Sequence, residues 1–325
     1  MKALFTEAFG SIGNLKFGEV KLPEVSPDSV LIDVAFAGVN YPDTLIVKGL
    51  YQFKPSIPFS PGCEVSGIVK EVGEDVAHVA VGDRVIGITG WGGYAEHVVV
   101  KEEYVYKIPD NVELKEASVL LETYATAYHG LKDRGALMHE ETLVVLGASG
   151  GTGSAAVEIG KTMGAKVIAV ASTDEKRSFC EALGADVVLG YEHIKEKLKK
   201  FGGVDVVFDP VGGEVSEQVF RTLKPNGRHL VVGFAGGNIP ALPWNLPLLK
   251  SASIVGVFWG SFWRNNPGQN KENNEYLIRL LSGGFVKPRI KHEFELKDGV
   301  EALRMLEDRE MIGKGVLSIK ASIST

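Results

Sequence analysis

The chain has 325 residues, 45% hydrophobic and 23% charged, a composition that supports a sizeable core and about two domains. Its net charge is −6 and it has no basic block, which argues against nucleic acid or an anionic membrane as the main partner. Its two cysteines, Cys63 and Cys180, exclude a disulfide framework and a four-cysteine zinc site. No apolar run is long enough for a membrane span or a signal peptide, so we expect a cytoplasmic protein.

Residues 1–120 have the pattern of a β-rich domain. Short strand-like segments lie at 30–37, 65–72, 83–88 and 95–100, with glycines between several of them. Strands at this spacing predict a small, partly open barrel.

From Thr142 onward, apolar strands alternate with helical segments, which predicts an α/β fold with a doubly wound parallel sheet. Residues 113–127 just before this region are expected to be helical. After Trp259 the alternation stops, so we expect the tail to return to the first domain, with helices at 272–281 and 296–306 and a final strand at 314–319. The six expected strands of the sheet are 143–146, 166–171, 187–189, 204–209, 229–234 and 254–259.

The segment 142–176 contains a glycine-rich turn in the context that dinucleotide binding requires. A buried strand is followed by Gly147, Gly150, Gly151, Thr152 and Gly153, then by a helical pattern and a second strand. Glycines let the backbone approach a pyrophosphate, and the helix N-terminus supplies N–H donors. The first fingerprint glycine is replaced by Ala148, so an unrelated α/β turn is the alternative.

The end of the second strand indicates which nucleotide is preferred. An NAD-dependent enzyme usually places Asp or Glu about 20 residues after the turn, to hold the ribose 2′-hydroxyl. This chain has Ser172 there, with Lys176 and Arg177 just beyond, and hydroxyls and cations suit a 2′-phosphate. We therefore predict NADPH as the cofactor and interpret Asp174 as a helix N-cap. Alternatively, the two basic residues are only solvated helix residues.

Several motifs together resemble the zinc-free quinone oxidoreductase branch of the medium-chain dehydrogenase/reductase superfamily. The resemblance implies a GroES-like β-barrel catalytic domain and an inserted Rossmann domain with a six-stranded sheet. The implied division is 1–120 for the first part of the catalytic domain, 121–260 for the Rossmann domain and 261–325 for the return. The motifs that carry the resemblance are Gly38-Val39-Asn40-Tyr41-Pro42-Asp43-Thr44, Pro61-Gly62-Cys63-Glu64, Val81-Gly82-Asp83-Arg84, Gly147–Gly153, Asp209-Pro210-Val211-Gly212-Gly213 and Gly313-Lys314-Gly315.

The same resemblance assigns expected contacts with the cofactor. The four turn residues from Gly150 to Gly153 are expected at the pyrophosphate, and Ser172 and Lys176 at the 2′-phosphate. The remaining expected contacts are Asn40, Thr126 near the nicotinamide, Tyr191 near the adenosine, Phe234, Phe258 and Trp259 around the nicotinamide and its ribose, and Lys314 at a phosphate. For Lys314, a solvated lysine at the edge of a strand is the alternative. The family also implies a homodimer formed through residues 253–259, an apolar edge strand that would otherwise invite aggregation.

A catalytic zinc requires three protein ligands, usually Cys, His or a carboxylate. Where zinc-dependent relatives carry a ligand cysteine, this chain has Asn40 nearby, and where they carry Gly-His-Glu it has Gly62-Cys63-Glu64. Cys63 and Glu64 are possible ligands, but no third partner is evident in the sequence. We therefore predict no metal, and we interpret His97 as a histidine of a barrel strand.

Without a strong Lewis acid, the substrate must be a good hydride acceptor, such as a quinone or an alkene conjugated to a carbonyl. Asn40 and Tyr51 are the candidate catalytic residues, as donors to the oxygen that becomes negative. The alternative to a catalytic role is that Asn40 only caps a turn and that Tyr51 only anchors a loop. Asp43 is expected to cap a helix that begins at Thr44. Rival functions are a reductase of enones or enoyl thioesters, a zinc alcohol dehydrogenase, and a structural or sensor protein that binds NADPH with little turnover.

Overall fold

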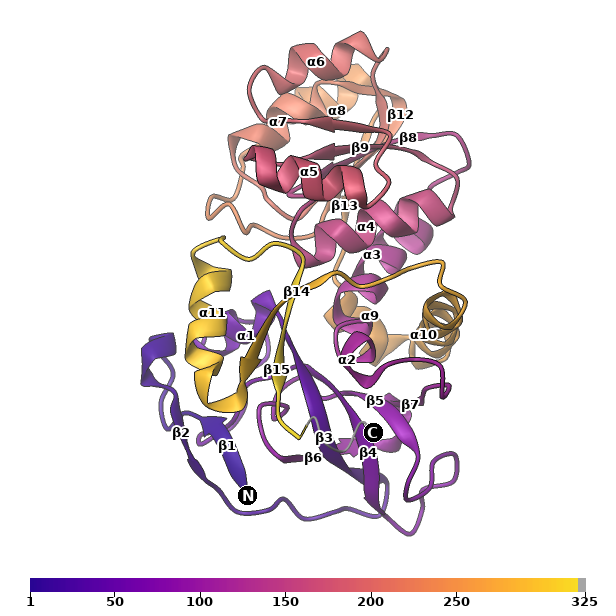
Figure 1. Cartoon of the computed structure of the whole chain (residues 1–325). Coiled ribbons are helices and arrows are strands. Elements are labelled where there is room, and N and C mark those ends of the chain that lie inside the picture. Colours follow the sequence, from indigo (N-terminus) through magenta and orange to yellow (C-terminus); the bar gives the residue numbers. More distant parts are fainter. Residues whose placement is uncertain (321–325) are drawn as a thin grey trace. The chain divides into compact units, whose positions relative to one another are not determined.

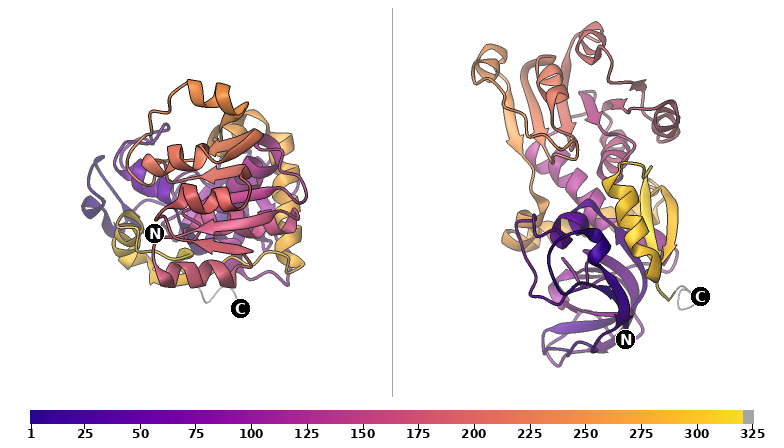
Figure 2. Two further views of the ribbon diagram at one scale, coloured as in Figure 1. Left: turned by 90° about the horizontal axis from the view of Figure 1, so that it is seen from above. Right: turned by 90° about the vertical axis from the view of Figure 1, so that its left-hand side faces the viewer.

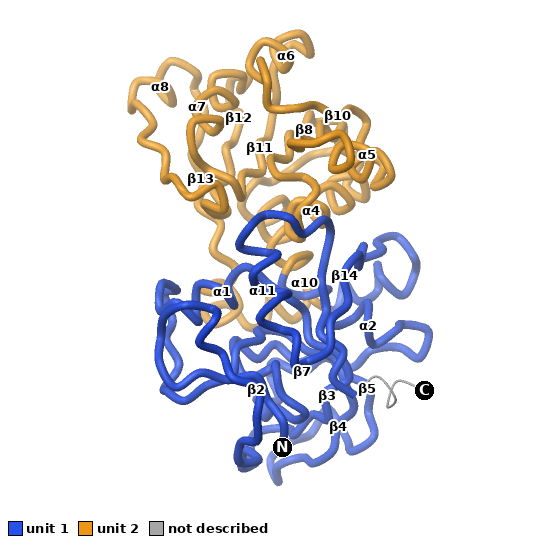
Figure 3. The backbone as a smooth tube through the Cα atoms, turned by 60° about the vertical axis from the view of Figure 1, so that its left-hand side comes forward, with its two compact units in different colours: residues 1–122, 275–325 blue, residues 123–274 orange. Residues whose placement is uncertain are grey.

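A computed structural model of the chain describes residues 1–320, which form two compact units (Figures 1 and 3). The first unit consists of residues 1–122 and the segment from Glu275 on, and the second consists of residues 123–274. The sequence places its boundaries after residues 120 and 260. The last five residues of the predicted return segment, 321–325, lie outside the described residues.

The second unit is built on a parallel sheet of six strands, in the order β10-β9-β8-β11-β12-β13. Apolar residues fill these strands because helices cover both faces of the sheet (Figure 2). The chain starts in the middle at β8, runs outward to β10, and then crosses back to β11, as in a Rossmann fold. The strands are β8 (Thr142–Leu146), β9 (Lys166–Val170), β10 (Val187–Leu189), β11 (Val204–Asp209), β12 (Leu223–Val231) and β13 (Ser253–Gly256).

All six strands occur where the sequence predicts a strand, but two of them have different ends. β12 begins earlier than predicted and ends at Val231, and β13 ends at Gly256. The chain leaves β13 early because Trp259 starts helix α9 and buries its ring there. The helices that begin in this unit are α3 (Thr126–Tyr128), α4 (Gly151–Thr162), α5 (Asp174–Ala182), α6 (Ile194–Lys200), α7 (Glu214–Phe220), α8 (Asn245–Lys250), α9 (Trp259–Asn265) and α10 (Pro267–Ser282).

The segment 113–127, which is expected to be helical, does not form one regular α-helix. The structure has the short helix α2 (Leu114–Ala117), and then wide π-helical turns at Leu121–Ala125 and His129–Arg134 on either side of α3. Such turns are frequent at functional sites. This segment contains Glu122 and the predicted cofactor residue Thr126.

The first unit contains a seven-stranded, mostly antiparallel sheet in which β3 is the central strand. β3 pairs with β4, β6 and β15, and its apolar residues form the centre of the core of this unit. Besides α2, the helices and strands of this unit are β1 (Lys2–Phe5), β2 (Lys16–Glu19), β3 (Ser29–Val39), α1 (Tyr41–Val47), β4 (Glu64–Val72), β5 (Arg84–Ile88), β6 (His97–Lys101), β7 (Val105–Lys107), β14 (Ile290–Glu295), α11 (Gly299–Glu307) and β15 (Lys314–Ser318).

The C-terminal strand β15 joins the sheet of the first unit beside β3, with Gly315 opposite Val39. This register brings residues from the two ends of the chain together, so that Lys314 lies beside Asn40. β14, which the sequence analysis did not predict, pairs with β15 in parallel. No helix within residues 1–320 has the length and apolar composition of a membrane span.

Candidate active site

The glycine-rich turn lies between β8 and the N-terminus of α4. Gly147 has a φ of 59°, and Gly150 is the N-cap residue of the helix. A Cβ atom on Gly153 would lie 2.2 Å from the carbonyl oxygen of Gly147, so only glycine lets the helix pack this closely on the turn. The first turn of α4 thus presents backbone N–H groups at the carboxyl edge of the sheet, where an anionic group is stabilised.

Tyr191 follows β10 and is tied to the same turn. Its hydroxyl oxygen accepts a hydrogen bond of 3.0 Å from the backbone N–H of Gly147. Burial raises the pKa of this phenol above its ordinary value, so it remains a neutral partner. The sequence analysis expects Tyr191 near the adenosine, and the structure gives it a further role in holding the turn.

The end of β9 carries the residues expected at a 2′-phosphate. Ser172 is exposed, and Lys176 lies in the first turn of α5. The N-cap of this helix is Thr173, whose hydroxyl accepts a hydrogen bond from the Lys176 backbone, so the prediction of Asp174 as N-cap is wrong. Asp174 instead pairs with Arg177, which also donates to the Ser172 carbonyl at 3.1 Å.

The other predicted cofactor residues of the second unit lie on three separate segments. Thr126 begins α3 and is half-buried. Phe234 follows β12, and its ring packs so closely on Gly212 that a Cβ atom there would lie 2.8 Å from Phe234 Cδ1. Phe258 is 41% exposed and precedes α9, whereas the ring of Trp259 is buried and donates to Asn270 at 2.9 Å.

In the first unit, the structure brings together a buried polar cluster around Asn40. Asn40 is the N-cap residue of α1, Glu64 begins β4 and Lys314 begins β15. The Asn40 amide nitrogen donates to Glu64 Oε1 at 3.1 Å, and Lys314 Nζ donates to Asn40 Oδ1 and to the Val39 carbonyl. Each of the three side chains is less than 4% exposed.

A second buried carboxylate, that of Asp43, is hydrogen-bonded to the backbone of Asn40. Asp43 is fully buried and accepts hydrogen bonds from the Asn40 backbone at 3.0 Å, the Gly62 backbone at 3.1 Å and the Tyr94 hydroxyl at 2.8 Å. Burial raises the pKa of Asp43 to about 6, although the hydrogen bonds from Tyr94 and the Asn40 backbone act in the opposite direction. The prediction that α1 begins at Thr44 is wrong, since the helix starts at Tyr41 and Asp43 caps it from within its first turn.

Burial raises the pKa values of three further acidic groups of the cluster. Burial, with Glu64 and Asp43 nearby, raises the pKa of Glu122 from its ordinary 4.5 to about 8. Burial also raises the pKa of the Cys63 thiol well above its usual range. Burial raises the pKa of Glu64 as well, and Lys314 opposes that shift. The sequence analysis missed Glu122 and Tyr94, because neither belongs to a motif that the spacing of residues reveals.

The second candidate catalytic residue, Tyr51, lies in the irregular segment after α1. It is half-buried, and its ring meets that of Phe53 edge-on with centroids 6.2 Å apart. His97 begins β6 and is buried between Asp33, at 3.3 Å, and two lysines. Among residues 1–320, no group of three or more His, Cys, Asp or Glu side chains is arranged to hold a metal ion.

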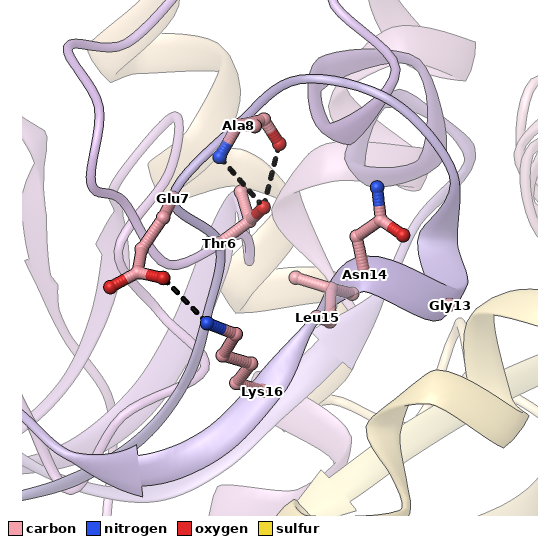
Figure 4. A pocket seen from close by; sticks show the side chains of 7 residues that line it. All are labelled: Thr6, Glu7, Ala8, Gly13, Asn14, Leu15 and Lys16. Atoms are coloured by element: carbon pink, nitrogen blue, oxygen red, sulfur yellow. Dashed lines mark hydrogen bonds and ion pairs between the residues drawn. The ribbon is translucent and has the colours of Figure 1, made fainter.

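A surface hollow of the first unit offers no comparable chemistry (Figure 4). Three of its polar side chains have partners within the hollow. Thr6 bonds to the backbone of Ala8, and Lys16 pairs with Glu7. The polar cluster around Asn40 and the turn before α4 are therefore the stronger candidates.

Comparisons with known proteins agree with this arrangement. The family described as "Alcohol dehydrogenase GroES-like domain" matches residues 26–110, and the one described as "Zinc-binding dehydrogenase" matches residues 151–280. Quinone oxidoreductase-like protein 2 of Bos taurus is 38% identical over 308 residues, which are 93% of this chain and 88% of the bovine protein.

Two solved structures extend the comparison. The Escherichia coli quinone oxidoreductase complexed with NADPH is 25% identical, with a TM-score of 0.91 over 98% of this chain and all of the bacterial one. The CurK enoyl reductase is 26% identical, with a TM-score of 0.87 over 98% of this chain and 99% of its own. The extent of these similarities shows that the protein is an oxidoreductase that belongs to the quinone oxidoreductase branch of the medium-chain dehydrogenase/reductase superfamily.

Proposed function

We propose that this protein uses NADPH to reduce a quinone or a similar activated carbonyl acceptor by hydride transfer, without zinc. The observation that carries the proposal is the turn before α4, where Gly153 leaves no space for a side chain and the helix N-terminus offers N–H donors. This cradle fits a pyrophosphate. Ser172 and Lys176 at the end of β9 add a hydroxyl and a cation that suit a 2′-phosphate.

The residues around Asn40 are better suited to hydrogen bonding than to holding a metal. The Asn40 amide is already engaged by Lys314 and Glu64. Among residues 1–320, the His, Cys, Asp and Glu side chains form no group of three or more that could hold a metal ion. The proposal therefore assigns catalysis to orientation of the two reactants and to hydrogen bonds at the acceptor.

In the proposed reaction, bound NADPH supplies the hydride and the acceptor oxygen gains negative charge. The side chains of Asn40 and Tyr51 are the proposed donors to that oxygen. Tyr51→Phe and Asn40→Ala should each lower kcat/KM by about tenfold, equivalent to about 1.4 kcal/mol of transition-state stabilisation. Two variants with wild-type kcat/KM would show that the protein acts by positioning alone.

Acceptor choice is tested by following NADPH oxidation with 9,10-phenanthrenequinone, a simple benzoquinone and an α,β-unsaturated ketone in parallel. The proposal expects the highest kcat/KM with a quinone. Reduction of the unsaturated ketone alone would favour the second candidate, a reductase of enones or enoyl thioesters, which the similarity to an enoyl reductase supports. Tight NADPH binding without turnover of any acceptor would indicate a structural or sensor protein.

We also propose a homodimer that forms through β13, the edge strand of the parallel sheet. Ile254 on this strand is exposed, and so are Trp244, Leu248 and Leu249 of the same unit. An apolar strand edge and its apolar surroundings are stabilised when a second copy covers them. Light scattering after size exclusion should give a dimer, and a monomer at micromolar concentration would contradict this assembly.

A further inference from the structure

The side-chain amide of Asn40 is held at both ends by charged groups. Lys314 Nζ donates to Oδ1, and Nδ2 donates to Glu64 Oε1 at 3.1 Å. A lysine can only donate, and a carboxylate can only accept. Both Glu64 oxygens face donors, since Oε2 accepts from the Glu122 backbone at 2.9 Å. Lys314 and Glu64 therefore fix the orientation of the amide, with Oδ1 toward the lysine and Nδ2 toward the carboxylate. The second N–H of Nδ2 is then left for another acceptor.

The ammonium group of Lys314 is buried and bonded to other residues of the first unit. Its side chain is 2% exposed, and its Nζ also donates to the Val39 carbonyl at 3.0 Å. Glu64 Oε1 lies 3.9 Å from the same nitrogen. The strand pairing of β15 with β3 places this lysine at Asn40 independently of any ligand. These contacts occupy the ammonium group inside the first unit, whereas the family resemblance implies that it contacts a phosphate.

We propose that Lys314 and Glu64 are positioning residues that orient the Asn40 amide, so that its remaining N–H points to the acceptor oxygen that gains charge. The inference rests on the proposed catalytic role of Asn40. If the amide were flipped, it would present Oδ1 to that oxygen, and two negative dipole ends would repel each other. Catalysis by Asn40 therefore depends on which end of its amide faces the acceptor, and not only on the presence of an amide.

The first test is Lys314→Met, measured for kcat and, separately, for the Kd of NADPH by fluorescence titration. We expect kcat to fall about tenfold while Kd stays within about twofold of the wild-type value. The double variant with Asn40→Ala should show no further loss, because residues that act through one another are not additive. A large rise in Kd, with effects that add in the double variant, would assign Lys314 to the cofactor and overturn the inference.

Lys320→Met is the matched control. Lys320 is a partly buried lysine of the same unit that pairs with Asp33 and lies 3.3 Å from His97 Nε2, and its backbone N–H donates to the Ala35 carbonyl. None of these three residues belongs to the Asn40 cluster. Its removal should change neither kcat nor Kd. A loss of kcat comparable to that of Lys314→Met would show that removing any buried ion pair in this unit impairs turnover, and the inference would fail.

Removal of Lys314 alone leaves Glu64 without its cation, which destabilises a buried site. The variant Lys314→Met/Glu64→Gln removes both charges and keeps the fold testable by circular dichroism and Tm. The glutamine must turn its oxygen to the Glu122 backbone, so its NH2 group faces Asn40 and favours the flipped amide. We expect a folded protein with normal NADPH affinity and reduced kcat.

The outcomes separate this inference from the proposed function. If Asn40→Ala lowers kcat but the folded double-charge variant turns over normally, only the positioning role is lost. If Asn40→Ala has no effect while quinone turnover persists, Asn40 is not the donor and both the donor assignment and the inference fail. If no acceptor is reduced by the wild-type protein, the proposed reaction itself fails.

Discussion

The turn before α4 and the polar cluster around Asn40 are built in opposite ways. The turn consists of backbone N–H groups on seven consecutive residues, Gly147–Gly153, and glycine is required at Gly153, where a Cβ atom would lie 2.2 Å from the Gly147 carbonyl oxygen. The cluster consists of side chains from five distant segments, carried by Asn40, Glu64, Tyr94, Glu122 and Lys314.

This difference predicts different responses to mutation. A site made of backbone N–H groups keeps its donors when a side chain is changed, because the donors are main-chain groups. It loses them only where a new side chain is too large for the space and displaces the backbone. A side-chain cluster responds to the loss of one partner, because the remaining buried groups lose their hydrogen bonds or their counter-charge. Three experiments test the contrast, beginning with the largest expected effect.

Gly153→Val should abolish cofactor binding, with a rise of at least about 100-fold in the Kd of NADPH, equivalent to about 2.7 kcal/mol. The added side chain must displace the carbonyl of Gly147 and tilt α4 away from the turn. Gly268→Ala is the control, since a Cβ atom on Gly268 meets nothing within 4 Å and that residue lies in helix α10. Equal NADPH affinity in the Gly153 variant would show that the close approach is not needed.

Glu122→Gln should change the pH dependence of stability. The pKa of Glu122 is raised from 4.5 to about 8, so the native state binds more protons than the unfolded state between these values. The free energy of unfolding therefore falls as pH rises through this range. Urea denaturation at several pH values from 5 to about 9 should show this decline in the wild type, and a weaker one in the variant. If the free energy of unfolding fell equally with pH in both proteins, Glu122 would not be the cause of the decline.

The smallest effect is expected at Lys176, at the edge of the proposed nucleotide site. Lys176→Ala should weaken NADPH binding about tenfold and leave NADH binding unchanged, because a single partly exposed cation contributes about 1.4 kcal/mol to a phosphate contact. Isothermal titration with both cofactors measures the ratio. Lys166→Ala, which removes an exposed lysine at the start of β9, is the control. A loss of affinity for both cofactors would point to a general charge effect instead.

Several parts of the protein were predictable because they depend on local patterns. The six parallel strands follow from short apolar runs separated by helical segments. The ends of β12 and β13 and the helix after residue 113 were less predictable. Trp259 shows why, since it continues an apolar run in the sequence but starts a helix to bury its ring.

The sequence by itself determined the class of fold, the glycine-rich turn before α4 and the family, because glycine spacing and strand periodicity are local properties of the chain. Only the tertiary structure decided the surroundings of Asn40. The pairing of β15 with β3 places Lys314 beside Asn40, although the two residues are 274 positions apart. Burial then shifts the pKa values of Asp43 and Glu122, and no local pattern encodes the dielectric surroundings of a side chain.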